Sequence, residues 1–232
     1  MKAENLNTTR LAQKFRLDNG FSQSEAVNVK SLLRKLNILT VYRPMSDCAF
    51  GLSLKSPKGF RFILVNSNTS RGRQHFTIAH ELFHLFYDDN PRPHMCSKDG
   101  TSRTERNADR FASALLMPEE GIIGMLTDEE YANKKITLAQ VLRLEQYFGV
   151  SRSTMLIRLK ELNLVSTSLY EELKNYPVKR SAQEYGYDDS LYLSGNENLV
   201  IGDYGEKARL LYEKEKISEG HYLELLNLIQ NG

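Results

Sequence analysis

The first third of the chain passes from a helical pattern of apolar residues to a strand pattern. Apolar side chains in residues 10–17 and 26–36 recur every three or four positions, which predicts two short amphipathic helices. Three runs rich in β-branched and aromatic residues follow, at Ile38–Tyr42, Ala49–Leu54 and Phe60–Val65, and a turn-forming Ser-Pro-Lys-Gly joins the last two. We therefore expect a small, mostly antiparallel sheet after a helical beginning.

Longer helical patterns occupy the rest of the chain. One extends from about 74 to 87 and ends before Pro91, because a residue that precedes proline disfavours the α conformation. A second covers roughly 103–116, and two more flank Gly149, at about 137–148 and 152–162. We expect three parts: a core with N-terminal helices in 1–132, a helical hairpin in 133–168, and aromatic, loop-rich sequence with a final helical pair in 169–232.

Composition narrows the class of protein. The 232 residues are 41% apolar and 26% charged, which is typical of a soluble globular chain. Lys and Arg exceed Asp and Glu by only 31 − 29 = 2, so no strong field favours nucleic acid or an anionic membrane. Residues 1–7 lack the apolar region of a secretory signal, two cysteines make no disulfide framework, and no apolar run approaches the ~20 residues of a membrane span. We expect a cytoplasmic protein that does not span a membrane.

The most informative motif is His80-Glu81-Leu82-Phe83-His84. On a helix, His80 and His84 lie one turn apart on the same face and can bind one Zn²⁺ through two imidazoles. Glu81 then lies beside the open coordination position, where it can act as a general base. Zinc lowers the pKa of water to ~7, so that Glu81 can take a proton as the water attacks a carbonyl and pass it to the leaving amine. This pattern suits a zinc-dependent hydrolase.

Such a site needs a third protein ligand. The metzincin positions hold Tyr87 and Asn90 instead of Gly and His, and His75 lies about 140° round the helix from His80. Glu105, on the next predicted helix, is the better candidate, and Asp109 one turn further can accept the second ring N–H of a zinc histidine. The predicted site is therefore His80, His84 and Glu105 with Asp109 behind them. His94 and Tyr131 are both candidates for stabilising the oxyanion, and the choice stays open.

Three segments carry a family resemblance. Gln74–His84, Glu105–Ala112 and the closing Leu115–Pro118 together resemble the ImmA/IrrE family of metallo-endopeptidases, and the similarity covers roughly 10–165. The resemblance implies an α+β fold with a thermolysin-like zincin core, zinc on His80, His84 and Glu105, and Glu81 as general base. His75 stands where the family often has Arg, and Asn107 where an acidic residue is common.

The resemblance also implies a partner. Members of this family are cytoplasmic regulators that cleave, or act on, a helix-turn-helix repressor of a mobile element, phage or stress regulon. A protein substrate of this kind would pair its backbone with an edge strand above the zinc helix, and we expect Phe60–Val65 to be that strand. The alternative is a non-enzymatic zinc-containing regulator that acts by binding protein or DNA.

Two further features have a functional and a plain interpretation. Residues 137–162 resemble a helix-turn-helix with Arg152, Arg158 and Lys160 available for phosphates; the alternative, which the weak signature favours, is a helical hairpin that packs on the core or binds the repressor. Cys96, in the predicted loop between the two zinc helices, is either a thiolate ligand that closes the fourth zinc position or, as we expect, an exposed loop cysteine without a role. The oligomeric state is not predicted.

Overall fold

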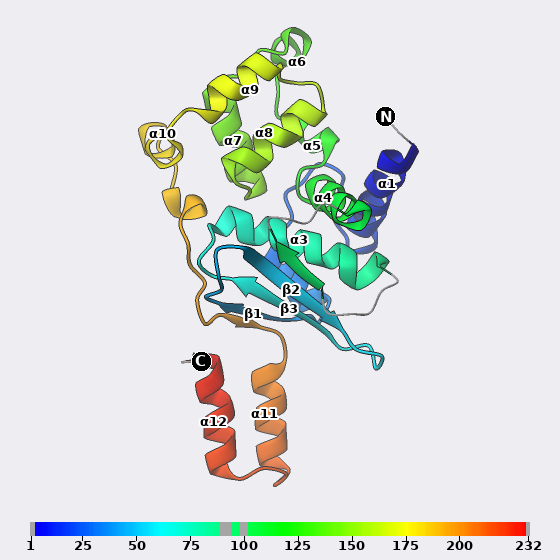
Figure 1. Ribbon diagram of the computed structural model, residues 1–232, viewed down its shortest axis with the longest axis vertical. Coiled ribbons are helices and arrows are strands. Elements are labelled where there is room, and N and C mark those ends of the chain that lie inside the picture. The colour runs from blue at the N-terminus through cyan, green and yellow to red at the C-terminus, as the bar shows by residue number, and fades with distance from the viewer. Residues whose placement is uncertain (1–2, 89–93, 98–101, 231–232) are drawn as a thin grey trace.

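The computed structural model describes residues 3–88, 94–97 and 102–230 as a mixed α+β protein (Figure 1). Among these residues, five strands form one sheet in the order β4-β2-β3-β1-β5. Strands β1 and β3 are parallel, and the other three neighbouring pairs are antiparallel, which confirms the mostly antiparallel sheet. The strands are β1 (Leu39–Arg43), β2 (Ala49–Lys55), β3 (Arg61–Asn66), β4 (His94–Ser97) and β5 (Val200–Ile201).

Strand β3 lies in the middle of this sheet. Val65 pairs with Gly51 of β2 on one side and with Tyr42 of β1 on the other. The expectation that Phe60–Val65 is a substrate-accepting edge is therefore wrong. Its backbone groups already bond to two neighbours, because β1 returns from earlier in the chain to pair with it in parallel. The edge strands of the described sheet are β4 and β5.

Helix α3 covers one face of the sheet, and two more helices pack behind it (Figure 1). Helix α3 (Arg71–Tyr87) packs on β2 and β3, and α4 (Arg103–Leu116) packs between α3 and α1 (Ala3–Asp18). The Ser70 hydroxyl caps α3 by accepting a hydrogen bond from the Arg73 N–H. Rings of Phe15, Phe83 and Phe111 meet at centroid separations of 5.6 and 5.8 Å, so that an aromatic cluster joins the three helices. The short α2 (Val29–Lys35) completes this layer.

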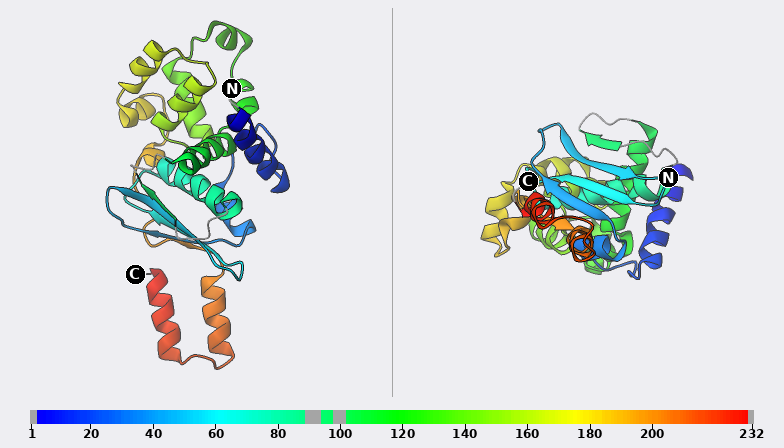
Figure 2. Two further views of the ribbon diagram at one scale, coloured as in Figure 1. Left: turned by 45° about the vertical axis from the view of Figure 1, so that its right-hand side comes forward. Right: turned by 90° about the horizontal axis from the view of Figure 1, so that it is seen from below.

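A second group of helices lies beyond α3 and α4 (Figures 1 and 2). The expected helices on either side of Gly149 are present, and Gly149 takes a φ of +64° between them. The expected loop-rich stretch after residue 170 is wrong in part, because it contains two helices and a 3-10 turn. These helices have only eight and seven residues, too few for a clear apolar period. The group consists of α5 (Glu119–Ile123), α6 (Asp128–Asn133), α7 (Leu138–Phe148), α8 (Arg152–Glu161), α9 (Thr167–Lys174), α10 (Val178–Glu184) and η1 (Asp189–Tyr192).

The chain ends in a helical hairpin on the opposite side of the sheet from α3 (Figure 1). Helices α11 (Tyr204–Glu213) and α12 (Glu219–Gln230) follow β5 directly. Stacked rings of Tyr212 and Tyr222, 4.9 Å apart, join the two helices. This is the helical pair that the sequence predicts. None of the helices in the described part of the chain is both long and apolar enough to cross a membrane.

Candidate metal centre

Helix α3 presents two histidines to the same point. His80 and His84 are one helical turn apart and are 2% and 5% exposed. Their Nε2 atoms lie 3.3 Å from each other. Two buried imidazole nitrogens so close are the arrangement that a shared cation stabilises.

Helix α4 adds a carboxylate to this pair. Its first turn holds Glu105, whose N–H donates to the Ser102 hydroxyl that caps the helix. The Glu105 oxygens lie 3.2 Å from Nε2 of His80 and 3.5 Å from Nε2 of His84. The structure therefore brings together the three ligands predicted from the sequence, from two helices that pack against each other.

The spacing of these donor atoms fits zinc. The two Nε2 atoms lie 3.3 Å apart, Oε2 of Glu105 lies 3.2 Å from Nε2 of His80, and Oε1 of Glu105 lies 3.5 Å from Nε2 of His84. The two imidazoles and the carboxylate thus form a triangle of donor groups. Ligands held tetrahedrally at 2.0–2.1 Å from one zinc ion are about 3.3 to 3.4 Å apart. The His₂Glu donor set and its dimensions both suit a catalytic zinc site with one position left for water or substrate.

Two carboxylates orient the imidazoles from behind. Nδ1 of His80 lies 2.9 Å from Oδ1 of Asp109, as the sequence predicts, and Nδ1 of His84 lies 2.9 Å from Oδ2 of Asp88. Each Nδ1–H donates to its carboxylate, which leaves Nε2 to bind a metal. Asp88 was not predicted from the sequence, although its signal was present: it follows His84 by four residues, directly after the last residue of α3.

The environment of His80 affects its charge. Burial lowers the pKa of His80, but hydrogen bonds with Asp109, Cys96 and Glu105 outweigh burial and raise the pKa well above the usual value. A protonated imidazole cannot bind a metal, so protons compete with a cation for this site.

Glu81 lies beside the donor triangle. It is fully buried, and its carboxylate lies within 4.8 Å of a ring nitrogen of His80 and of Sγ of Cys96. The backbone of β2 approaches it closely at Gly51, where a Cβ atom would lie 3.7 Å from Oε1 of Glu81. The position suits a carboxylate that exchanges a proton with a group bound at the centre.

Other residues considered from the sequence lie elsewhere. His75 points away from the centre, as predicted, and its Nδ1 lies 2.8 Å from the carbonyl oxygen of Gly149. Tyr131 is on α6, which Figure 1 places far from α3. The side chain of His94 falls outside the described residues. Cys96 is neither exposed nor in a loop, because it is buried on β4.

Two of the three basic residues considered for phosphate contacts in 137–162 are not available for them. Arg152 is buried and donates two hydrogen bonds to Glu145, and Arg158 is buried and donates to the carbonyl oxygen of Met117. Only Lys160 of the three is exposed. Both arginines hold the helical layer together, which the sequence pattern of basic residues does not reveal.

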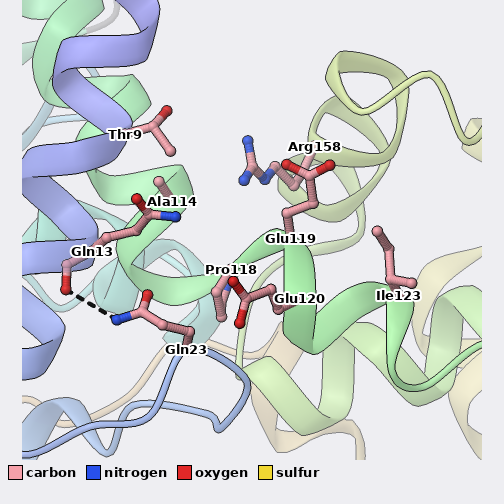
Figure 3. Close-up of a pocket in the computed structure, with 9 residues that line it drawn as sticks. All are labelled: Thr9, Gln13, Gln23, Ala114, Pro118, Glu119, Glu120, Ile123 and Arg158. Carbon is pink, nitrogen blue, oxygen red and sulfur yellow. Dashed lines mark hydrogen bonds between the residues drawn. The ribbon is translucent and has the colours of Figure 1, made fainter.

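A hollow of about 210 Å³ lies apart from the metal centre (Figure 3). It is lined by side chains of α1, α4, α5 and α8, among them Gln13, Glu119 and Arg158. None of the predicted site residues lines it. A second hollow of similar size does include Asp109, together with Arg73 and Ile157, so the surface beside the metal centre is recessed between α3, α4 and α8.

One comparison with known proteins identifies the family of this chain. Residues 33–160 match the Peptidase M78 family, described as the IrrE N-terminal-like domain. The chain belongs to this family, as its motifs indicated. No curated protein matches the chain. Among solved structures, a Mycobacterium tuberculosis transcriptional regulator is similar with 19% identity and a TM-score of 0.44. That match covers 66% of this chain and 46% of the other, so the chain spans less than half the length of that protein.

Proposed function

We propose that this protein is a zinc-dependent endopeptidase with a zincin-like core. The observation that carries the proposal is the triangle of His80, His84 and Glu105 donors with the buried carboxylate of Glu81 beside it. A zinc site that only stabilises a fold is usually closed by four protein ligands and needs no base next to it. Membership in a peptidase family supports the same conclusion.

Each residue of the centre has its own role in the proposed hydrolysis. His80, His84 and Glu105 would hold the zinc ion, and Asp109 and Asp88 would keep the two imidazoles in the binding tautomer. When bound, zinc polarises the substrate carbonyl and lowers the pKa of water. Glu81 takes the proton of the attacking water and passes it to the amine that leaves. Its burial keeps this proton from exchanging with bulk solvent between the two steps.

The substrate that we propose is a protein regulator, specifically a helix-turn-helix transcriptional repressor. The proposal rests on the family resemblance. Cleavage would remove the repressor from its operator, which gives a peptidase of narrow specificity a regulatory effect.

The test compares the wild type with Glu81→Gln in host cells. Both proteins are expressed at equal levels, and new protein N-termini are identified across the proteome. We expect N-termini that appear only with the wild type, and these name the substrate. Glu119→Gln, which changes a carboxylate of the separate hollow, is the matched control and should cleave like the wild type.

Measuring the zinc bound by variants distinguishes the proposed base, Glu81, from the proposed ligands. Glu81→Gln should retain zinc and lose hydrolysis, whereas His80→Ala should lose both, because only the second removes a donor of the triangle. Full cleavage by Glu81→Gln would contradict the proposed mechanism. Absence of zinc from the wild type would contradict the metal site and favour a regulator that acts by binding alone.

A further inference from the structure

A cysteine lies beside the metal centre. Cys96 is 8% exposed, and its Sγ lies within 4.8 Å of a ring nitrogen of His80 and a carboxylate oxygen of Glu81. Its thiol is also a hydrogen-bond partner of His80. Cys96 therefore belongs to a buried cluster of three metal-binding side chains that shares His80 with the donor triangle.

Strand pairing holds this cysteine in place. On the edge strand β4, Cys96 lies opposite Gly51 of β2, and the register shifts between Ala49 and Gly51. Irregularities of this kind redirect a side chain and are common beside active sites. Gly51 in turn lies against α3, since a Cβ there would be 2.6 Å from Cγ2 of Thr77. Pairing with β2 therefore fixes the place of Cys96, and the close approach of Gly51 to α3 fixes the place of β2.

We propose that the thiolate of Cys96 is the fourth ligand of the zinc ion held by His80, His84 and Glu105. This inference rests on the proposed zinc site. A thiolate is a strong zinc ligand, and a sulfur and an imidazole nitrogen on one zinc ion are about 3.6 Å apart. Cys96 groups with His80 and Glu81 and not with His84 or Glu105, so its side chain or strand β4 moves toward those two donors when the sulfur binds the same ion. The thiol releases one proton to solvent as its sulfur binds, and nothing is oxidised or reduced.

Closure by Cys96 makes the folded protein latent. A catalytic zinc needs one position without a protein ligand, so Glu81 has no water to activate while the sulfur is bound. Strand β4 pairs with β2 alone among the described strands. Separation of β4 from β2 would withdraw Cys96 and expose a row of β2 backbone groups that can accept another strand. A substrate segment that replaces β4 would open the metal centre as it binds.

The first test uses Co²⁺ in place of zinc in the full chain. A thiolate bound to Co²⁺ gives a strong near-ultraviolet charge-transfer band that nitrogen and oxygen ligands do not give. We expect this band in the wild type and in Cys48→Ala, which removes the exposed second cysteine, and its loss in Cys96→Ala. Zinc should also slow alkylation of the Cys96 thiol at least about tenfold, because a bound thiolate is a poor nucleophile. Absence of the band from the wild type would overturn the proposal.

Activity provides a second and separate test. Cys96→Ala should produce the Glu81-dependent cleavages at least about tenfold faster than the wild type, since its fourth position is open. A cobalt band in the wild type without cleavage by Cys96→Ala would support the ligand and contradict the peptidase. Equal cleavage by the wild type and Cys96→Ala, with no cobalt band in the wild type, would support the peptidase and contradict Cys96 as a ligand. If Cys96→Ala does not fold, the spectra and alkylation of the wild type and Cys48→Ala still decide.

Discussion

His84 and Asp88 form a pair on the last turn of α3 that matches the pair of His80 with Asp109. In both pairs a ring Nδ1 lies 2.9 Å from a carboxylate oxygen. One carboxylate comes from the same helix and the other from α4. The two imidazoles are therefore oriented independently, and the metal centre does not depend on a single supporting contact.

We expect Asp88→Asn and Asp109→Asn each to weaken zinc binding by about 10- to 100-fold, because loss of the carboxylate leaves an imidazole less basic and less well oriented. Competition with a chromophoric chelator measures the affinity. Asp128→Asn, on the distant α6, should bind zinc like the wild type. Unchanged affinity in both test variants would show that these carboxylates do not support the metal.

The buried ion pair of the helical layer should matter for stability. Glu145 is fully buried, and Arg152 donates to it at 2.7 and 2.8 Å. Burial raises the pKa of Glu145, while the hydrogen bond and charge of Arg152 lower it, and burial prevails. We expect Arg152→Leu to lower the free energy of unfolding by about 3 to 5 kcal/mol, because it leaves a buried carboxylate without its charged partner.

Urea unfolding measures this loss. The matched control is Arg180→Leu, which breaks the exposed pair of Arg180 with Glu184 on α10 and should cost less than about 1 kcal/mol. Similar losses in the two variants would mean that the buried pair has no special role. Such a result would also mean that a gain in stability does not explain the burial of Arg152.

Replacing Gly51, on β2, should lower the stability of the protein. A Cβ atom there would lie 2.6 Å from Cγ2 of Thr77 and 3.0 Å from the carbonyl oxygen of Leu64. We expect Gly51→Ala to destabilise the protein by about 1 to 3 kcal/mol, because the backbones of β2 and β3 or the zinc helix must move. Gly220→Ala, in the first turn of α12 with open space around it, should be neutral or slightly stabilising. Thermal unfolding of both variants tests the difference.

His75 should make stability depend on pH. Burial lowers the pKa of His75, and its hydrogen bond with Gly149 offsets this only in part. In the unfolded chain the histidine takes a proton at about pH 6.5, above its folded pKa. Protonation therefore favours unfolding, and stability falls as the pH decreases below about 6.5 until the folded pKa is passed.

The variant His75→Asn keeps a donor for Gly149 without the titration. We expect it to lose less stability than the zinc-saturated wild type between pH 7 and pH 5, as measured by urea unfolding. His221→Asn, at an exposed position on α12, should follow the wild type. A His75→Asn curve parallel to that of the wild type would contradict the role of His75.

The sequence by itself determined the parts of the site that depend on local geometry. His80, Glu81 and His84 share a helix, and the spacing of 3.6 residues per turn places both imidazoles on one face whatever surrounds them. The bounds expected for α4 match those found, since Ser102 caps one end and Pro118 follows the other. The family motifs named Glu105 and Asp109, and the structure brings both to the histidines.

Only the tertiary structure decided how distant segments meet. The central place of β3, the pairing of Cys96 with Gly51 and the burial of Arg152 and Arg158 all depend on residues far apart in the chain. A strand of four residues such as β4 carries almost no periodic signal and is stabilised by its neighbour, not by its own sequence. Whether the metal centre is open or closed therefore depends on a contact that no local pattern records.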